Sequence, residues 1–169
     1  LFGLQSSLHP FITHPSYRLL RDLPLAERVA RLRDPEVRAA LLADDPATEN
    51  RIAVARMQRW DQMFPLGNPP DNEPAPSKSV AAVAAREGRA PEEVVLDWLL
   101  ARDGKALLFA PLASYSDGDH GAIHEMITHP ASVLGLSDGG AHCGLICDAS
   151  MPSTLLTHWV RDRSRGPRL

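Results

Sequence analysis

The stretch that decides how this chain folds is Val133-Leu134-Gly135-Leu136-Ser137-Asp138-Gly139-Gly140-Ala141-His142. Its apolar start is long enough for a buried parallel strand and too short for a typical helix. Asp138 would stand at the carboxyl end of this strand, where barrel enzymes place their catalytic groups. Gly139 and Gly140 leave the backbone open for close approach of a ligand or for a positive φ. A carboxylate placed there can bind a metal and exchange protons with a metal-bound water.

The same residues have a purely structural interpretation, in which Asp138 begins a tight turn, because Asp-Gly is a common turn dipeptide. His142 follows four residues later. In the catalytic interpretation His142 contacts the substrate or supports a ligand at the site. In the structural interpretation it hydrogen-bonds the turn. The local sequence leaves both interpretations open.

The composition is that of an ordinary globular protein, and the net charge indicates which kinds of partner are not favoured. The chain has 169 residues, enough for about one domain with a real core, with 44% hydrophobic and 23% charged residues. A net charge of −3 does not favour nucleic acid or an anionic membrane as a partner. No run of 18 apolar residues predicts a membrane span, and the start at Leu1 lacks the features of a secretory signal. We therefore expect a cytoplasmic protein, and the missing initiator Met suggests a piece of a longer one.

The order of elements predicts an α/β fold. Residues 78–169 alternate as helix, helix, strand, helix, strand, helix, which is typical of βα units. Residues 1–77 contain a loop and helices that do not fit this alternation, so we expect a lid-like helical insertion there. Helices are expected from Pro24 and over 34–43, 48–62, 79–88, 91–104, 119–128 and 152–163, and strands over 106–109 and 133–138.

Several segments together resemble one family. Leu134 to His142 looks like the last barrel-strand motif of the metal-dependent amidohydrolases, and the branch it most resembles is the N-acyl-D-amino-acid deacylases (D-aminoacylases). The other segments that agree in order and spacing are Ser7-Leu8-His9-Pro10-Phe11, Arg33-Asp34-Pro35-Glu36-Val37-Arg38, Ser116-Asp117-Gly118 and His129-Pro130. All of them resemble the carboxyl-terminal third of that branch. The Ser-Asp-Gly-Gly motif is the specific one among them.

The resemblance implies a fold and a reaction. The fold would be the last βα units of a (β/α)₈ barrel, so this chain would form a partial barrel with a helical insertion. The reaction would be hydrolysis of the amide of an N-acyl-D-amino acid or a similar small molecule. Zinc would hold and acidify a water, and Asp138 would take its proton and return it to the leaving nitrogen. Asp138 would also contact the metal, with Gly139, Gly140 and His142 close to the substrate.

The chain departs from the family pattern in ways that bear on activity. The family's His-x-His and its ligands from the middle strands are absent from this sequence. A zinc site takes three protein ligands or more, which one carboxylate does not supply. We therefore expect this chain alone to bind zinc weakly or not at all and to be inactive without the missing barrel portion. Where the branch often has His-Pro-Arg, this chain has Cys143-Gly144-Leu145-Ile146-Cys147-Asp148, so its substrate preference is open.

The remaining histidines and cysteines offer weaker candidates. His120 and His124 are four apart on an expected helix, which is ligand spacing, but the sequence positions no third ligand. Cys143 and Cys147 could pair on a metal, although free cysteine is more often a small buried residue. His158 is expected on the surface of the last helix, while His9, His14 and His129 precede prolines and end or cap elements. The rival to the enzyme is a non-catalytic helical module that binds a partner.

Overall fold

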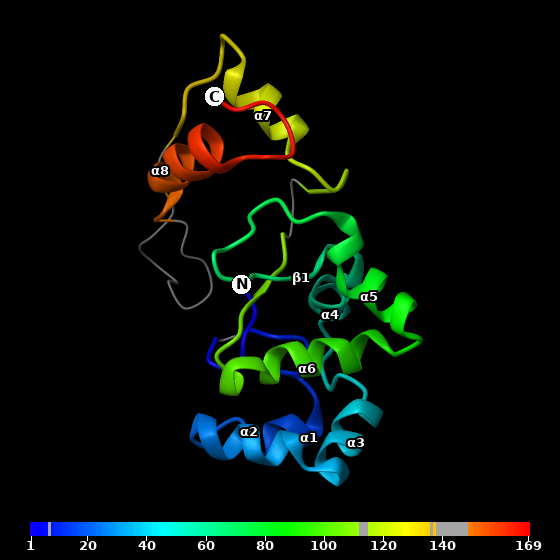
Figure 1. Cartoon of the computed structure of the whole chain (residues 1–169). Helices are drawn as coiled ribbons and strands as arrows, with labels where there is room; N and C mark the ends of the chain where they lie inside the picture. The colour runs from blue at the N-terminus through cyan, green and yellow to red at the C-terminus, as the bar shows by residue number, and fades with distance from the viewer. Residues whose placement is uncertain (7, 112–114, 136, 138–148) are drawn as a thin grey trace.

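The structure is a computed structural model of the chain that describes residues 1–6, 8–111, 115–135, 137 and 149–169. Helices α1 to α6 gather in one body, and α7, α8 and the C-terminus lie together at the far end of the molecule (Figure 1). The α-helices are α1 (Pro15–Arg18), α2 (Leu25–Arg33), α3 (Pro35–Ala43), α4 (Arg51–Met57), α5 (Val80–Glu87), α6 (Pro91–Gly104), α7 (Gly121–Thr128) and α8 (Met151–Thr154). Two 3₁₀ turns, η1 (Trp60–Gln62) and η2 (Pro76–Lys78), and a π-helix, η3 (Leu155–Asp162), complete the helical elements.

Local capping signals begin and end the helices where the sequence predicts them. The Asp34 carboxylate caps α3 by accepting hydrogen bonds from the backbone N–H groups of Glu36 at 2.9 Å and Val37 at 3.3 Å. The Ser79 hydroxyl caps α5 by accepting from the Ala82 N–H at 3.2 Å. Gly88 ends the same helix with a φ of 63°, a conformation that favours glycine. The predicted starts of α3 and α5 are confirmed.

The hydrophobic core draws on both halves of the sequence. Helix α6 contributes Val95, Leu96 and Leu99, all fully buried, and α2 packs against it through Val29 and Leu32. These two helices lie on opposite sides of the expected domain boundary at residues 77 and 78. The boundary stays a prediction, but the two ranges share one core.

Helix α6 ends earlier than its hydrogen-bonded span. Residues Ala101 to Asp103 leave the helical conformation, and Arg102 and Asp103 take positive φ values of 53° and 55°. Gly104 follows with a φ of 77°, and a Cβ there would lie only 2.5 Å from the Val29 Cγ2 atom. Gly104 therefore both reverses the chain and lets α2 approach. This agrees with its predicted role as the terminator.

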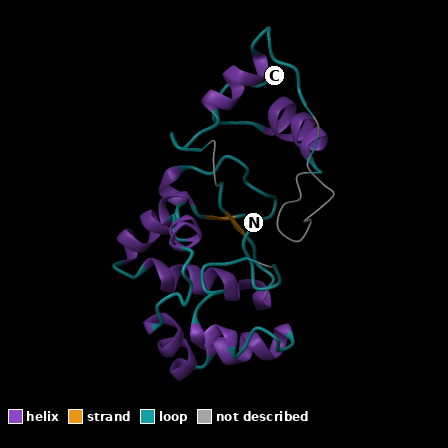
Figure 2. Ribbon diagram, turned by 180° about the vertical axis from the view of Figure 1, so that it is seen from behind, coloured by secondary structure: helices purple, strands orange, loops and turns teal. Residues whose placement is uncertain are grey.

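The described strands form one small antiparallel ladder. Strand β1 (Phe64–Pro65) pairs with β2 (Leu108–Phe109), and Phe2 bridges to Leu108 on the other side. Figure 2 shows this ladder in orange among the helices. The strand predicted over 106–109 is confirmed at its end. The partial barrel stays a prediction.

The strand predicted over 133–138 is wrong in its described part. Residues 133–135 and Ser137 lie in a loop, and the Val133 side chain is 93% exposed. A strand needs a neighbouring strand to satisfy its backbone groups. Within the described ranges the ladder of β1 and β2 pairs with no part of residues 133–135. Without such a partner, apolar composition alone does not make a strand here.

The helix predicted over 48–62 is shorter in the structure than expected. On the last helix, some side chains predicted to be buried are exposed instead. Helix α4 covers only Arg51–Met57 and is followed by the separate turn η1. At the C-terminal end, the sequence pattern predicts that Leu155, Leu156, Trp159 and Val160 face inward. Trp159 is buried as predicted and Leu155 is half-buried, whereas Leu156 and Val160 are exposed, at 65% and 44%. The π-helix η3 bonds i to i+5 instead of i to i+4, so a 3.6-residue period predicts only part of its buried face. Within the described ranges, no helix combines the length and apolar character needed to cross a membrane.

Candidate functional site

The residues that the sequence singles out most strongly lie outside the described part of the chain. They are Asp138, Gly139, Gly140 and His142, together with Cys143 and Cys147. Ser137, directly before the motif, is described and lies in a half-buried loop. The catalytic and turn interpretations of Asp138 therefore both stay predictions.

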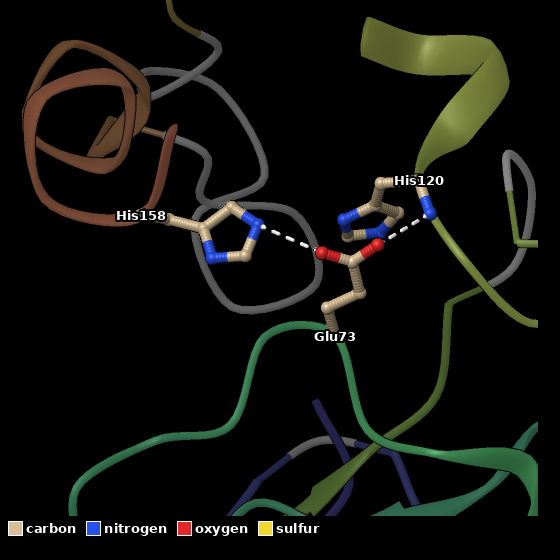
Figure 3. A group of neighbouring side chains, drawn as sticks. All are labelled: Glu73, His120 and His158. Atoms are coloured by element: carbon tan, nitrogen blue, oxygen red, sulfur yellow. Dashed lines mark hydrogen bonds and ion pairs between the residues drawn. The ribbon is translucent and has the colours of Figure 1, made fainter. Parts of the chain in front are cut away.

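The described residues bring together a different group, made of Glu73, His120 and His158 (Figure 3). Glu73 belongs to the loop between β1 and η2, His120 stands at the N-cap of α7, and His158 lies in the π-helix η3. One potential ligand atom from each lies within 4.8 Å of the other two. The three segments are distant in sequence and meet only in the fold.

Glu73 is the centre of this group and is 4% exposed. Its Oε2 accepts a hydrogen bond from Arg163 Nε at 2.9 Å, and its Oε1 accepts from Arg163 Nη2 at 3.1 Å. Oε1 also accepts from the backbone N–H of His120 at 2.8 Å. His158 Nε2 lies 3.7 Å from Oε2, which is an ion-pair distance if the ring is protonated but too long for a hydrogen bond. The carboxylate is therefore held in one orientation by a buried guanidinium.

Burial and charge set the protonation of the three groups. Burial by itself would raise the pKa of Glu73, but the Arg163 hydrogen bonds and charge, with the His120 N–H, hold that pKa below its usual range. Burial lowers the pKa of His120 and of His158, against the opposing charge of Glu73. At neutral pH the site therefore contains an ionised carboxylate and two neutral imidazoles, which is the state that binds metal.

Aromatic side chains surround the two imidazoles. The His120 ring lies edge-on to Tyr115 with ring centroids 4.9 Å apart, and its centroid is 5.7 Å from that of His158. The Trp159 ring is 5.2 Å from His158 and also stacks under the Arg163 guanidinium at 4.8 Å. These contacts fix the rings but satisfy none of their nitrogens. Among the described residues, His120 Nδ1 and His158 Nε2 are buried and have no hydrogen-bond partner.

Two cavities adjoin this part of the molecule. One of about 100 Å³ is bordered by Glu73, His158 and Arg163, with Asp71 and Asp162 on its wall. The other, of about 370 Å³, is mainly apolar and is lined by Ile123, Ile127, Leu134, Leu155 and Trp159, among others. The second cavity lies beside Leu134, four residues before Asp138 in the sequence.

The other histidines divide into buried and capping residues. His124 lies on α7 beside Trp159 but is not part of the Glu73 group, so the structure does not pair it with His120 on a metal. His129 caps the end of α7, and its Nδ1 accepts from the Ala131 N–H at 3.2 Å. His14 stands at the N-cap of α1, and His9 is fully buried. The predictions that His14 and His129 cap elements are confirmed, whereas His9 lies in a loop and borders no helix or strand.

Sequence reasoning missed two members of the group. The prediction that His158 lies on the surface is wrong, because the side chain is 8% exposed. Glu73 stands in the proline-rich loop and carried no motif at all. The available signal was chemical and weak: one of two acids among prolines, in Asp71-Asn72-Glu73-Pro74-Ala75-Pro76. Only tertiary contacts show that this acid is buried against Arg163.

The comparisons with known proteins identify one family. The model described as "Amidohydrolase family" matches residues 4–169, nearly the whole chain. No protein of curated function and no solved structure matches it.

Proposed function

The chain belongs to the amidohydrolase family, and from this premise we propose that it is the carboxyl-terminal part of a hydrolase that cleaves the amide of an N-acyl-D-amino acid or a similar small molecule. The observation that carries the proposal is the family match over residues 4–169, which includes the Ser137-Asp138-Gly139-Gly140 motif. The family supports a hydrolase acting on a small-molecule amide. The acyl-D-amino-acid substrate, the fragment status and the metal dependence belong to the proposal.

Asp138 has the chemistry that this reaction needs from a protein side chain. Amide hydrolysis requires a base that takes a proton from the attacking water and an acid that returns one to the leaving nitrogen. A carboxylate performs both steps in turn. Gly139 and Gly140 would let the substrate backbone approach this carboxylate, and His142 would contact the substrate or support the site.

The ligand set that the family uses for zinc is incomplete in this chain. When bound, zinc would acidify the attacking water. The ligands that the family uses are absent from the sequence, apart from the single carboxylate of Asp138. We therefore assign no step to zinc, and we propose that the chain is inactive without the barrel portion that would carry those ligands. The predicted cytoplasmic location belongs to the same proposal.

The apolar cavity beside Leu134 fits the acyl half of such a substrate. Isoleucine, leucine and tryptophan side chains line it, and its volume of about 370 Å³ is in the range of small-molecule sites. Filling it by Ile127→Trp should lower kcat/KM for long acyl groups more than for acetyl in the full-length natural protein. Equal losses for both acyl groups would remove the cavity from the proposal.

The central test is Asp138→Asn in the full-length natural protein. The substitution keeps the shape and an oxygen atom but removes the base. Since general acid–base groups contribute about 10²–10⁴ in rate, kcat should fall by at least about a hundredfold with little change in stability. Asp148→Asn is the matched control, because it is also acidic and nearby in sequence but has no assigned role.

Two results would contradict this function. One is near-normal kcat with Asn at position 138, and the other is an equal loss with Asn at position 148. The rival, a non-catalytic helical module that binds a partner, would gain from either result. It would gain further if no N-acyl-D-amino acid were hydrolysed by the unmodified protein.

A further inference from the structure

We propose that Glu73, His120 and His158 form a binding site for one divalent transition metal, with zinc as the ion that their chemistry favours. Two imidazoles and one carboxylate are a common zinc ligand set that leaves a fourth position open. Imidazole ligands also favour zinc over magnesium or calcium, which prefer oxygen. This site uses neither Asp138 nor the apolar cavity, so it stands apart from the argument for amide hydrolysis.

The hydrogen bonds of Glu73 leave one lone pair available on the side where the metal would sit. An ionised carboxylate offers about four lone-pair positions. Oε1 accepts from Arg163 and from the His120 backbone, and Oε2 accepts from Arg163 only. The remaining position belongs to Oε2, the atom that lies 3.7 Å from His158 Nε2. Arg163 thus orients the carboxylate without using all of its capacity.

The spacing of the three side chains is close to that of a metal site. Ligand atoms about 2.1 Å from a tetrahedral zinc lie roughly 3.4 Å from one another. The observed group spans at most 4.8 Å, with 3.7 Å between Glu73 and His158. A contraction on the order of 1 Å completes the geometry.

The two histidines have no other evident use for their buried nitrogens. His120 Nδ1 and His158 Nε2 have no hydrogen-bond partner among the described residues, and a buried polar atom left unpaired costs about 1–3 kcal/mol. A metal would satisfy an imidazole lone pair.

Both positive and negative side chains surround the site, and they act on a bound metal ion in opposite directions. Arg163 contacts Glu73 directly and repels a dication, and Arg165 donates to the Glu73 carbonyl oxygen. Three carboxylates act in the opposite direction: Asp119 is close to His120 and Arg163, and Asp71 and Asp162 are close to His158. Two of these acids also pair with other cations, Asp71 with Lys78 and Asp162 with Arg161, so they offset the guanidinium charge only in part. The fold therefore places negative charge around the two histidines as well as between them.

Space for a metal and a bound water is present beside the ligands. The cavity of about 100 Å³ has Glu73 and His158 on its wall, together with Asp71, Asp162 and Arg163. One water needs roughly 30 Å³ of liquid volume, so the cavity holds the fourth ligand of a zinc ion.

Binding would join three segments of the molecule. Glu73 belongs to the body formed by the first helices, while His120 and His158 belong to the group of α7, α8 and η3 (Figures 1 and 3). A metal that binds only the folded arrangement stabilises it by mass action. The ion would therefore fasten the C-terminal helices to the loop that carries Glu73.

The experiment is titration of the metal-free 169-residue chain with Zn²⁺, followed by calorimetry, and with Co²⁺, followed by absorption. In place of the weak or absent zinc binding expected from the family's ligands alone, we expect one ion per chain, a raised thermal midpoint, and a cobalt spectrum of nitrogen and oxygen ligands. His120→Phe and His158→Phe keep aromatic rings in place but remove ligand nitrogens. Each should weaken zinc binding by more than about 100-fold, beyond the 10- to 100-fold typical of supporting residues.

Matched controls separate this site from every other candidate. His124→Phe removes a histidine on the same helix that is outside the group and should leave zinc affinity unchanged. The double change Cys143→Ser and Cys147→Ser should do the same, and so should Asp138→Asn. If the Asp138→Asn variant still binds zinc, the metal site does not depend on Asp138. The two proposals can then fail independently, because the proposed function is tested by kcat and the metal site by zinc binding.

Three outcomes would overturn the site: absence of stoichiometric binding, a thiolate-to-cobalt charge-transfer band, or loss of binding in the Cys or Asp138 variants instead of the His variants. If a Phe variant does not fold, as judged by circular dichroism in chelator, the cobalt spectrum of the unmodified chain decides. Sulfur ligation in that spectrum excludes the site without any variant.

Discussion

His9 is fully buried against Tyr17, with ring centroids 4.4 Å apart, and neither of its nitrogens meets a partner among the described residues. Burial, with the charge of Arg28 and then of His14, lowers the pKa of His9 from its ordinary value of 6.5 to about 3. A residue with a proton-binding ring thus serves as a neutral core residue. At the residue scale, the surroundings decide what a side chain does.

The first prediction concerns acid stability. The folded-state pKa of His9 lies below the unfolded-state value, so the unfolded chain binds the proton first. Stability from neutral His9 is present above about pH 6.5 and is lost toward pH 3, by about 1.4 kcal/mol per pH unit between the two values. His9→Leu should remove this part of the acid sensitivity. Urea midpoints at pH 7 and pH 4.5 measure it, and an unchanged difference between them would contradict the assignment.

Arg28 shows the opposite use of a polar side chain, because its guanidinium binds the chain at several points. Nη1 donates to the Leu4 carbonyl at 2.7 Å, and Nη2 donates to the carbonyls of Arg21 at 2.7 Å and Leu23 at 2.9 Å. Nη1 also lies 3.2 Å from the Tyr17 hydroxyl. The planar fork of donors holds the N-terminal loop on α2.

The second prediction is that Arg28→Lys destabilises the chain by about 1–3 kcal/mol. A lysine keeps the charge but cannot reach several carbonyls in one plane, and hydrogen bonds to charged groups are worth about 1.5–3 kcal/mol. Arg31→Lys, on the exposed side of the same helix, is the control and should change stability little. Chemical denaturation would measure both. Equal effects would mean that the fork geometry is irrelevant.

At the scale of elements, capping residues predict helix ends correctly, whereas hydrophobic patterns over longer segments predict helix faces and strands less well. Asp34 and Ser79 cap their helices because capping needs only an accepting side-chain oxygen within three residues of the N–H groups that donate to it. On the last helix the prediction is right for Trp159 and wrong for Leu156 and Val160, because η3 has π-helical bonding, which no local residue indicates. Val133 and its neighbours failed as a strand because strands depend on partners elsewhere in the chain.

The third prediction tests the strongest local signal. Asp34→Ala removes the acceptor for the Glu36 and Val37 N–H groups and should cost about 1 kcal/mol, within a range of 0.5–2. Asp45→Ala removes an exposed acid in the loop after α3 and should stay within about 0.5 kcal/mol. Thermal unfolding of the two variants would compare them. A loss for Asp45→Ala as large as for Asp34→Ala would show that charge, and not capping, is the cause.

At the scale of the whole molecule, one buried ion pair joins the two ends of the structure. Glu73 and Arg163 are 90 residues apart and 4% and 2% exposed. Arg165 adds bonds from Nη1 to the carbonyls of Glu73, Pro74 and Gly118, each at 2.9 to 3.1 Å. Helix α7 itself has no fully buried residue. Polar contacts therefore contribute much of what holds the C-terminal helices in place.

The fourth prediction is that Arg163→Met, measured in chelator, destabilises the chain by about 3–5 kcal/mol. It leaves the Glu73 carboxylate buried without its partner, which is the costly way to break an ion pair. Arg161→Met breaks an exposed pair with Asp162 on the same element and should have little effect. Hydrogen exchange should show faster opening of α7 and η3 than of α2 and α6. Uniform loss of protection would contradict a local fastening role.

The sequence by itself determined the family, the caps and the helical segments. Family motifs such as Ser137 to Gly140 are contiguous, and caps such as Asp34 act within one turn, so both are visible in linear order. The Glu73, His120 and His158 group was decided only by tertiary structure. Its members come from three segments that pack together, and burial of Glu73 by Arg163 depends on contacts across 90 residues. No local pattern encodes such a contact, because its energy arises only when solvent is excluded from both partners at once.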